Sequence, residues 1–130
     1  MRFSDADRDA ISRAGELFVK NALANPRNDR ASADCYEDDA IMLAPSRSPV
    51  IGRVAIEAFL SSFPPFSGYR LEVAEIVGDG DLAFERGTAS MTLRPTEGPT
   101  DQFRINYVVI WRRQIDGSWR AAREIFTPAA

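Results

Sequence analysis

Residues 106–126, which read NYVVIWRRQIDGSWRAAREIF, constrain the fold of this chain more than any other segment. Two runs rich in β-branched and aromatic residues flank Asp116-Gly117, a dipeptide that accepts the positive φ angles of a two-residue hairpin turn. Counting outward from this turn places Val109 opposite Glu124. We therefore predict that this segment forms a long antiparallel hairpin whose register follows from the turn.

The two faces of this predicted hairpin differ in one carboxylate. The same count pairs Trp111 with Ala122, and strand periodicity then puts Glu124 among aromatic and aliphatic side chains. This first face comprises Tyr107, Val109, Trp111, Ala122, Glu124 and Phe126. The opposite face comprises Val108, Ile110, Arg112, Trp119, Ala121, Arg123 and Ile125. Because both faces are substantially apolar, we expect one to line a pocket and the other to meet a partner.

A change of periodicity divides the chain into a helical part and a sheet part. Apolar residues recur at helical spacing in the first half and alternate with polar residues from Tyr69 onward. We predict helices at 4–25, 29–36 and 53–63, a short hairpin of 40–44 with 49–52, and strands at 69–77, 82–93 and in the closing hairpin. Helices followed by antiparallel strands indicate an α+β fold, here one domain spanning 1–130.

The composition excludes several classes of site. The sequence contains no histidine, which removes Ser-His-Asp and Cys-His catalysis and any imidazole ligand for a metal, so we expect neither a metal nor a cofactor. A net charge of -3 without a long basic run predicts no nucleic-acid partner. The single cysteine, Cys35, is interpreted as a small buried hydrophobe.

The sequence also bears on the location of the protein. It has acidic residues where a signal peptide needs an apolar core, and it has no apolar run long enough to span a membrane. We therefore expect a cytoplasmic protein without membrane contact.

The order of the predicted elements, with the segments YEDDAIMLAP, PVIGRVAIEAFL and YVVIWRRQIDGSWRAAREIF, resembles the nuclear transport factor 2-like superfamily. The similarity is greatest to its SnoaL-like, ketosteroid-isomerase-related bacterial branch, and it runs from about Asp9 to Phe126. The resemblance implies a cone-like, curved antiparallel sheet wrapped round about three N-terminal helices, with a pocket inside and dimerisation through the outer face. Members include isomerases, cyclases, dehydratases, epoxide hydrolases and non-catalytic binders, so the fold alone does not name the activity.

The residues that serve steroid isomerases of this superfamily have no counterparts in the sequence. The resemblance places the general base at Ala44, an oxyanion-hole aspartate at Val109 and an oxyanion-hole tyrosine at Phe18 or its neighbours. Without a base for the α-proton and donors for the enolate, that mechanism is not available at these positions. We therefore exclude the usual steroid isomerase reaction.

Glu124 is the strongest candidate for a catalytic or ligand-anchoring group. The resemblance makes its face of the hairpin the inner one, and a carboxylate in an apolar cavity has a raised pKa. The alternative is a structural role in which an arginine pairs with Glu124. Tyr36, predicted at the end of the second helix, either lines the pocket or packs in the core. Met42 lies on the same side of its predicted strand as Ala44, and we expect it to form part of the cavity wall. The pair Asp38-Asp39 is expected to terminate the second helix.

The orientation of the strand predicted at 82–93 stays open, because the long loop after it hides its register. One parity turns Leu82, Phe84, Thr88 and Ser90 inward, and the other turns Ala83, Glu85, Gly87 and Met91 inward. The second parity would bring Glu85 into the pocket beside Glu124. Two carboxylates with different pKa values can divide acid and base roles, as in the water-activating epoxide hydrolases of the superfamily.

Two functions are compatible with these observations. The first is a pocket for a small apolar or amphipathic molecule, with acid/base catalysis by Glu124 and a weaker contribution from Glu85. Its expected wall comprises Tyr36, Met42, Ala44, Tyr107, Val109, Trp111, Ala122 and Phe126. The second is a non-catalytic binding or dimerisation module. In either case we predict a homodimer through the outer face, formed by Val108, Ile110, Trp119, Ala121 and Ile125.

Overall fold

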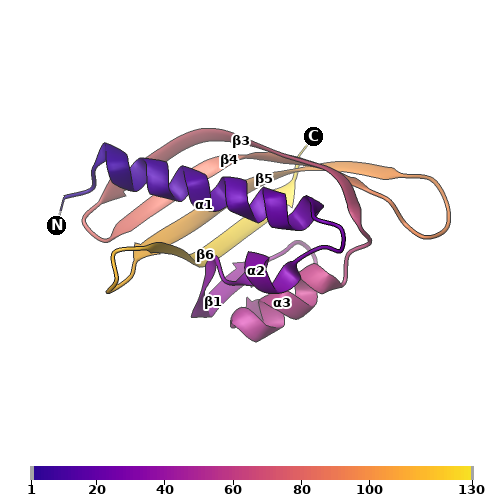
Figure 1. Ribbon diagram of the computed structural model, residues 1–130, viewed down its shortest axis with the longest axis horizontal. Helices are drawn as coiled ribbons and strands as arrows, with labels where there is room; N and C mark the ends of the chain where they lie inside the picture. The colour runs from indigo at the N-terminus through magenta and orange to yellow at the C-terminus, as the bar shows by residue number, and fades with distance from the viewer. Residues whose placement is uncertain (1, 130) are drawn as a thin grey trace.

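A curved sheet of six strands and three helices form the part of the chain that the computed structural model describes, residues 2–129 (Figure 1). The helices are α1 (Asp5–Leu23), α2 (Asp29–Ala33) and α3 (Arg53–Ser61). The strands are β1 (Tyr36–Leu43), β2 (Val50–Ile51), β3 (Phe66–Asp79), β4 (Leu82–Leu93), β5 (Asp101–Arg113) and β6 (Trp119–Pro128). The predicted α+β class and the division into a helical half and a sheet half are confirmed.

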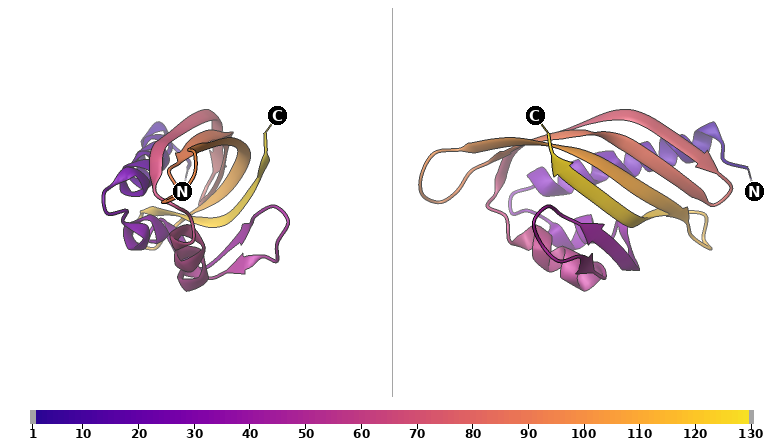
Figure 2. Two further views of the ribbon diagram at one scale, coloured as in Figure 1. Left: turned by 90° about the vertical axis from the view of Figure 1, so that its right-hand side faces the viewer. Right: turned by 180° about the vertical axis from the view of Figure 1, so that it is seen from behind.

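The sheet has the order β2-β1-β6-β5-β4-β3, and its strong curvature is seen in the end-on view of Figure 2. The pairs β3–β4, β4–β5 and β5–β6 are antiparallel, as predicted. β1, in contrast, runs parallel to β6. This correction to an all-antiparallel sheet matters for the site, because the parallel pairing places the first residue of β1, Tyr36, beside Ala121 near the start of β6.

The long helix α1 lies across the inner face of the sheet (Figure 1). Ser4 caps it as predicted: the Ser4 side chain accepts a hydrogen bond from the backbone N–H of Asp7, and the Asp7 carboxylate accepts one from the Ser4 backbone N–H. The Asp7 carboxylate also binds the Arg113 guanidinium at 2.7 Å, and Trp119 Nε1 donates to it at 3.2 Å. Arg113 holds the pKa of Asp7 well below its usual range. The start of α1 is thereby attached to the end of the closing hairpin.

The turn of the closing hairpin has one residue more than predicted. Gln114 N–H donates to Ser118 O at 2.7 Å, which closes a three-residue loop in which Gly117 has a φ of +88°. A type I turn followed by a glycine at positive φ is the common geometry for this loop length. Trp119 therefore pairs with Arg113, and the predicted register is wrong next to the turn.

A second irregularity restores the predicted register further along the hairpin. Trp111 pairs with Ala121 and Ile110 with Arg123, so a β-bulge inserts Ala122 between them. Beyond this bulge Val109 faces Glu124, as predicted. The two one-residue shifts cancel. Counting from the turn therefore places Glu124 correctly, although the count assumes a turn that is one residue too short.

The bulge also corrects the predicted outer face. Trp119 and Ala121 do not lie on it, because between the turn and the bulge the parity of β6 is reversed. Both side chains are buried in the core, and Trp119 packs edge-on against Phe3. The remaining residues of the expected outer face are Val108, Ile110 and Ile125.

Two predictions for the first half of the chain are also wrong. Helix α2 ends at Ala33, and Tyr36 begins β1 instead of ending the helix. Asp38 and Asp39 lie inside β1 and do not terminate a helix; Asp38 forms an ion pair of 2.8 Å with Arg53.

Among residues 2–129, no helix is long and apolar enough to cross a membrane.

Candidate functional site

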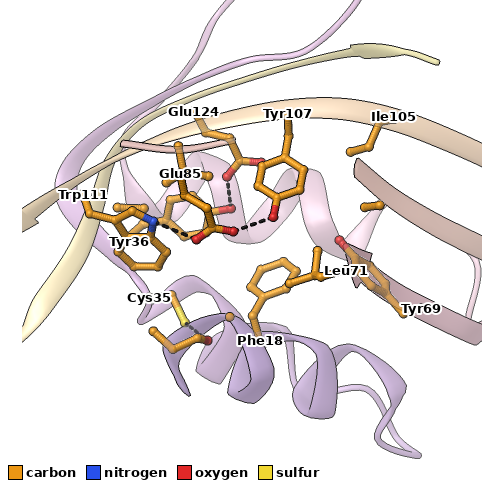
Figure 3. A pocket seen from close by; sticks show the side chains of 15 residues that line it. Phe18, Cys35, Tyr36, Tyr69, Leu71, Glu85, Ile105, Tyr107, Trp111 and Glu124 are labelled. Atoms are coloured by element: carbon orange, nitrogen blue, oxygen red, sulfur yellow. Dashed lines mark hydrogen bonds between the residues drawn. The ribbon is translucent and has the colours of Figure 1, made fainter. Parts of the chain in front are cut away.

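A cavity lies between α1 and the inner face of the sheet. We call it the inner chamber; Figure 3 shows its walls, with Phe18, Cys35, Tyr36, Tyr69, Leu71, Glu85, Ile105, Tyr107, Trp111 and Glu124 labelled. Its volume is about 60 Å³, which is smaller than the several hundred cubic ångströms typical of a ligand pocket. Most of its surface is apolar, and two carboxylates enter it.

Glu124 comes from the middle of β6 and meets a tyrosine from β1. Tyr36 Oη donates a hydrogen bond of 2.6 Å to Glu124 Oε1 (Figure 3). The Tyr36 backbone is held in turn by Arg53, whose Nε and Nη2 donate to the Tyr36 carbonyl at 2.9 and 2.7 Å. The predicted alternative, an arginine paired with Glu124, is not found among the described residues.

The environment raises the pKa of Glu124 to about 7. Burial is the largest cause, because the charged form loses its hydration. The hydrogen bond from Tyr36 acts in the opposite direction, and the negative charge of Glu85 raises the pKa further. Glu124 is therefore divided between its protonated and ionised forms near neutral pH.

Glu85, the second carboxylate, points inward from β4, so the second of the two open parities is the correct one. The residue is only 3% exposed. Tyr107 Oη donates to Glu85 Oε2 at 2.5 Å, and Trp111 Nε1 donates to Oε1 at 3.2 Å. Burial raises the pKa of Glu85, while the two hydrogen bonds oppose the shift. Both oxygens of this carboxylate are thus occupied by protein donors.

The two carboxylates differ in what they can offer a ligand. Within residues 2–129, Glu124 has one hydrogen-bond partner, Tyr36, and its Oε2 receives no hydrogen bond from the protein. Glu85 is fixed by two donors from β5. Glu124 can therefore exchange a proton with a bound molecule, whereas both oxygens of Glu85 are already held by donors of the protein.

The three tyrosines of the chamber stay protonated. Burial is the largest cause that raises the pKa of Tyr36, Tyr69 and Tyr107 well above the ordinary value. The nearby carboxylates raise all three further, since a tyrosinate would add a negative charge beside them. Each tyrosine is therefore a neutral hydrogen-bond donor.

A second cavity, also of about 60 Å³, adjoins the inner chamber at the end where α2 and α3 lie. We call it the phenylalanine chamber, because its wall includes Phe59, Phe63, Phe66, Phe103 and Phe126. The two chambers share Phe18, Tyr36, Tyr69, Ile105 and Glu124. Glu124 thus stands where the two cavities meet.

Most of the residues predicted from the sequence line these chambers. The inner chamber includes Glu124, Glu85, Tyr36, Tyr107, Val109 and Trp111, and the phenylalanine chamber includes Met42 and Phe126. Ala44 follows β1 and is absent from both linings. Ala122 is buried in the bulge, and its neighbour Ala121 takes its place in the wall.

Sequence reasoning missed Tyr69 and the phenylalanines that follow α3. Strand periodicity places Tyr69 in a strand, but it does not indicate which side of that strand turns inward. The run FLSSFPPF, residues 59–66, carries the signal that was available, three phenylalanines close together around a helix end.

Among residues 2–129, no group of three or more cysteine or carboxylate side chains is arranged to hold a metal ion.

Two comparisons concern the sequence. The family model described as "SnoaL-like domain" matches residues 18–122. No curated protein matches the sequence.

Solved structures with the same fold cover almost the whole chain. A ketosteroid isomerase-like protein from Erwinia carotovora atroseptica is 21% identical, with a TM-score of 0.80 and coverage of 94% of this chain and 95% of that chain. A conserved protein from Planctomyces limnophilus is 20% identical, with a TM-score of 0.85 and coverage of 97% and 100%. An NTF2-like protein with a cystatin-like fold from Novosphingobium aromaticivorans is 20% identical, with a TM-score of 0.74 and coverage of 93% and 80%. At this identity the likeness shows the fold alone.

Proposed function

Because the chain belongs to the SnoaL-like domain family, we propose that its two chambers bind a small, mainly apolar molecule and that Glu124 transfers a proton to or from it. The reaction is of the isomerase, cyclase, dehydratase or hydrolase type and uses the side chains of the protein. The single observation that carries this proposal is the carboxyl of Glu124, with its pKa of about 7 and one oxygen unpaired in an apolar cavity.

The chemistry of Glu124 follows from its two protonation states. As a carboxylate, Oε2 accepts a proton from a C–H bond next to a carbonyl of the ligand, and the electron pair moves to the carbonyl oxygen. The protonated carboxyl then returns the proton to another atom, or gives it to a departing hydroxyl. A pKa near the working pH keeps both forms available. Tyr36 is a positioning residue, since its hydroxyl fixes Oε1.

Steroid isomerisation by the usual mechanism stays excluded from this proposal. Ala44 and Val109 stand where that mechanism needs carboxyl groups, and Ala44 lies outside both chambers. The size of the cavities adds a second argument. At about 60 Å³ each, they have no room for four fused rings.

Hydrogen exchange into simple ketones tests the proposed proton transfer. In D2O near pH 7, with cyclohexanone and acetophenone as probes, we expect the native protein to catalyse deuterium uptake at the carbon next to the carbonyl. Glu124→Gln should slow this uptake by about a hundredfold, because it removes the base but keeps the shape. Proton NMR of the probes measures the rate.

Glu97→Gln is the matched control, since Glu97 is exposed in the loop between β4 and β5. This variant should exchange at the native rate. Equal rates for the native protein and Glu124→Gln would contradict the proposal and favour the alternative, a binding module without turnover.

We further propose that a second copy of this chain covers the outer face of β5 and β6. Ile125 is 44% exposed there, with Val108 and Ile110 partly buried beside it, and in Figure 2 no helix of the described residues lies over this face. We expect light scattering to give twice the chain mass of 14.4 kDa. Ile125→Glu should halve that mass, because it places a charge in the contact. A mass of one chain for the native protein would contradict the dimer.

A further inference from the structure

Ser32 has a buried hydroxyl without a partner. The residue lies in α2 and is 2% exposed, and within residues 2–129 its Oγ makes no hydrogen bond. Ser32 is one of the residues that line the phenylalanine chamber. A buried hydroxyl without a partner lowers the free energy of unfolding. Alanine at position 32 would avoid this cost and has a higher helix propensity than serine.

The neighbouring Arg27, in contrast, is explained by the fold. Its Nη1 donates to Pro64 O at 2.9 Å and its Nη2 donates to Phe63 O at 2.9 Å. Its Nε lies 2.7 Å from Asp29 Oδ1 in an ion pair, although this contact is not aligned as a hydrogen bond. Arg27 therefore joins α2 to the segment after α3, whereas the fold leaves the Ser32 hydroxyl of this wall without a hydrogen-bond partner among residues 2–129.

We propose that Ser32 is a ligand-binding residue, and that the ligand is a neutral one-ring molecule whose hydrogen-bonding substituent contacts Ser32 Oγ while its reactive end lies at Glu124. This inference rests on the proposed function, because it uses Glu124 as the reacting group. It adds the class of the ligand and the residue that orients it.

The volume of the chambers sets the size of the ligand. Each holds about 60 Å³, whereas a cavity that binds benzene has roughly 150 Å³. One ring therefore has to occupy both chambers, with a small movement of the shared Phe18 or Tyr69 side chain. Ser32 and Glu124 both line the phenylalanine chamber, so a molecule there lies between them.

The wall around Ser32 favours a planar ring. Phe59 and Phe63 meet edge to face with centroids 5.3 Å apart, and Phe66 and Tyr69 do so at 5.2 Å. Such walls offer ring edges and faces to an aromatic guest. The carboxylate of Glu124 repels an anion, and the positive charge of Arg27 is already paired with Asp29, so a neutral ligand fits best.

Phenol and toluene form a matched pair of probes, because they share one ring and differ in a hydroxyl against a methyl group. We expect the native protein to bind phenol more tightly than toluene in titrations followed by NMR, with shift changes in α2. Ser32→Ala should weaken phenol binding about tenfold and leave toluene binding within about twofold, since it removes only the hydroxyl. Melting curves without ligand establish that the variant is folded.

The same titrations on Glu124→Gln separate this inference from the proposed function. If Ser32 anchors the hydroxyl, Glu124→Gln keeps the preference for phenol, even where the deuterium exchange of ketones fails. The inference is overturned if Ser32→Ala binds phenol as the native protein does. It is also overturned if Glu124→Gln, and not Ser32→Ala, abolishes the preference.

Discussion

Glu124→Gln is expected to stabilise the protein at pH 8, although it removes the group that we propose as the acid/base residue. The folded protein raises the pKa of Glu124 from 4.5 to about 7. Protonated Glu124 thus contributes stability that is fully present below pH 4.5 and is lost as the pH rises through about 7. The shift corresponds to about 3 kcal/mol. Glutamine stays neutral at every pH and avoids this loss.

Urea denaturation at several pH values measures the effect. The free energy of unfolding of Glu124→Gln minus that of the native protein should rise by about 3 kcal/mol between pH 4 and pH 8. Taking this difference cancels groups common to both proteins, such as Asp7. Glu97→Gln, a substitution of the same kind in the exposed loop between β4 and β5, is measured alongside as the control. A flat profile for Glu124→Gln would mean that the carboxyl has an ordinary pKa and would remove the basis of the proposed function.

Gly87→Ala is expected to destabilise the protein by about 3 kcal/mol, at the upper end of the range for overpacked sites. A Cβ atom on Gly87 would lie 2.5 Å from the carbonyl oxygen of Glu72 and 2.8 Å from Tyr107 Oη. The first obstacle is the backbone of β3, which cannot move alone. The second is the hydroxyl that donates to Glu85, so the substitution should also displace one of the two donors that hold this carboxylate.

Gly68→Ala is the matched control for this prediction. Gly68 lies in β3, where a Cβ atom would meet only the Thr92 side chain, at 3.3 Å. Both substitutions reduce the entropy of the unfolded chain alike, so the difference between them reports the native-state clash. Urea denaturation should show Gly87→Ala less stable than Gly68→Ala by most of the predicted amount. Equal stability of the two variants would contradict the prediction, because it would show that the backbone of β3 shifts at Glu72 to make room for the added methyl group.

A stabilising substitution at a functional residue has a physical meaning. A buried carboxyl with a raised pKa costs stability at neutral pH, and such costs are typical of sites where chemistry takes place. Tyr36 offsets only part of the cost with its hydrogen bond. The unpaired hydroxyl of Ser32 is a second cost of this kind, at the other end of the proposed ligand.

The position of Glu124 could be predicted, but for a reason that the sequence does not display. Counting from Asp116-Gly117 assumes a two-residue turn, whereas the loop has three residues and a bulge at Ala122 compensates. In β6, only the part beyond the bulge keeps its predicted faces. The count consequently puts Trp119, between the turn and the bulge, on the wrong face.

Glu85 could not be placed from the sequence. Strand periodicity divides β4 into two sets of side chains, but both sets contain apolar residues, and the loop of 94–100 allows either register. The choice depends on neighbours from other strands: Val109 of β5 and Ile76 of β3 pair with Glu85. Tyr107 and Trp111 then supply the donors that make its burial tolerable.

The sequence by itself determined the α+β class, the capped first helix and the extent of β4. It also determined which side chains point inward in the part of the closing hairpin that lies beyond the bulge. These features follow from local periodicity and from hydrogen bonds between near neighbours. The tertiary structure alone decided the parallel pairing of β1 with β6, the bulge at Ala122, the inward turn of Glu85 and the unpaired hydroxyl of Ser32. Each of these depends on which distant segments share a surface, and a pattern of two or 3.6 residues carries no information about distant partners.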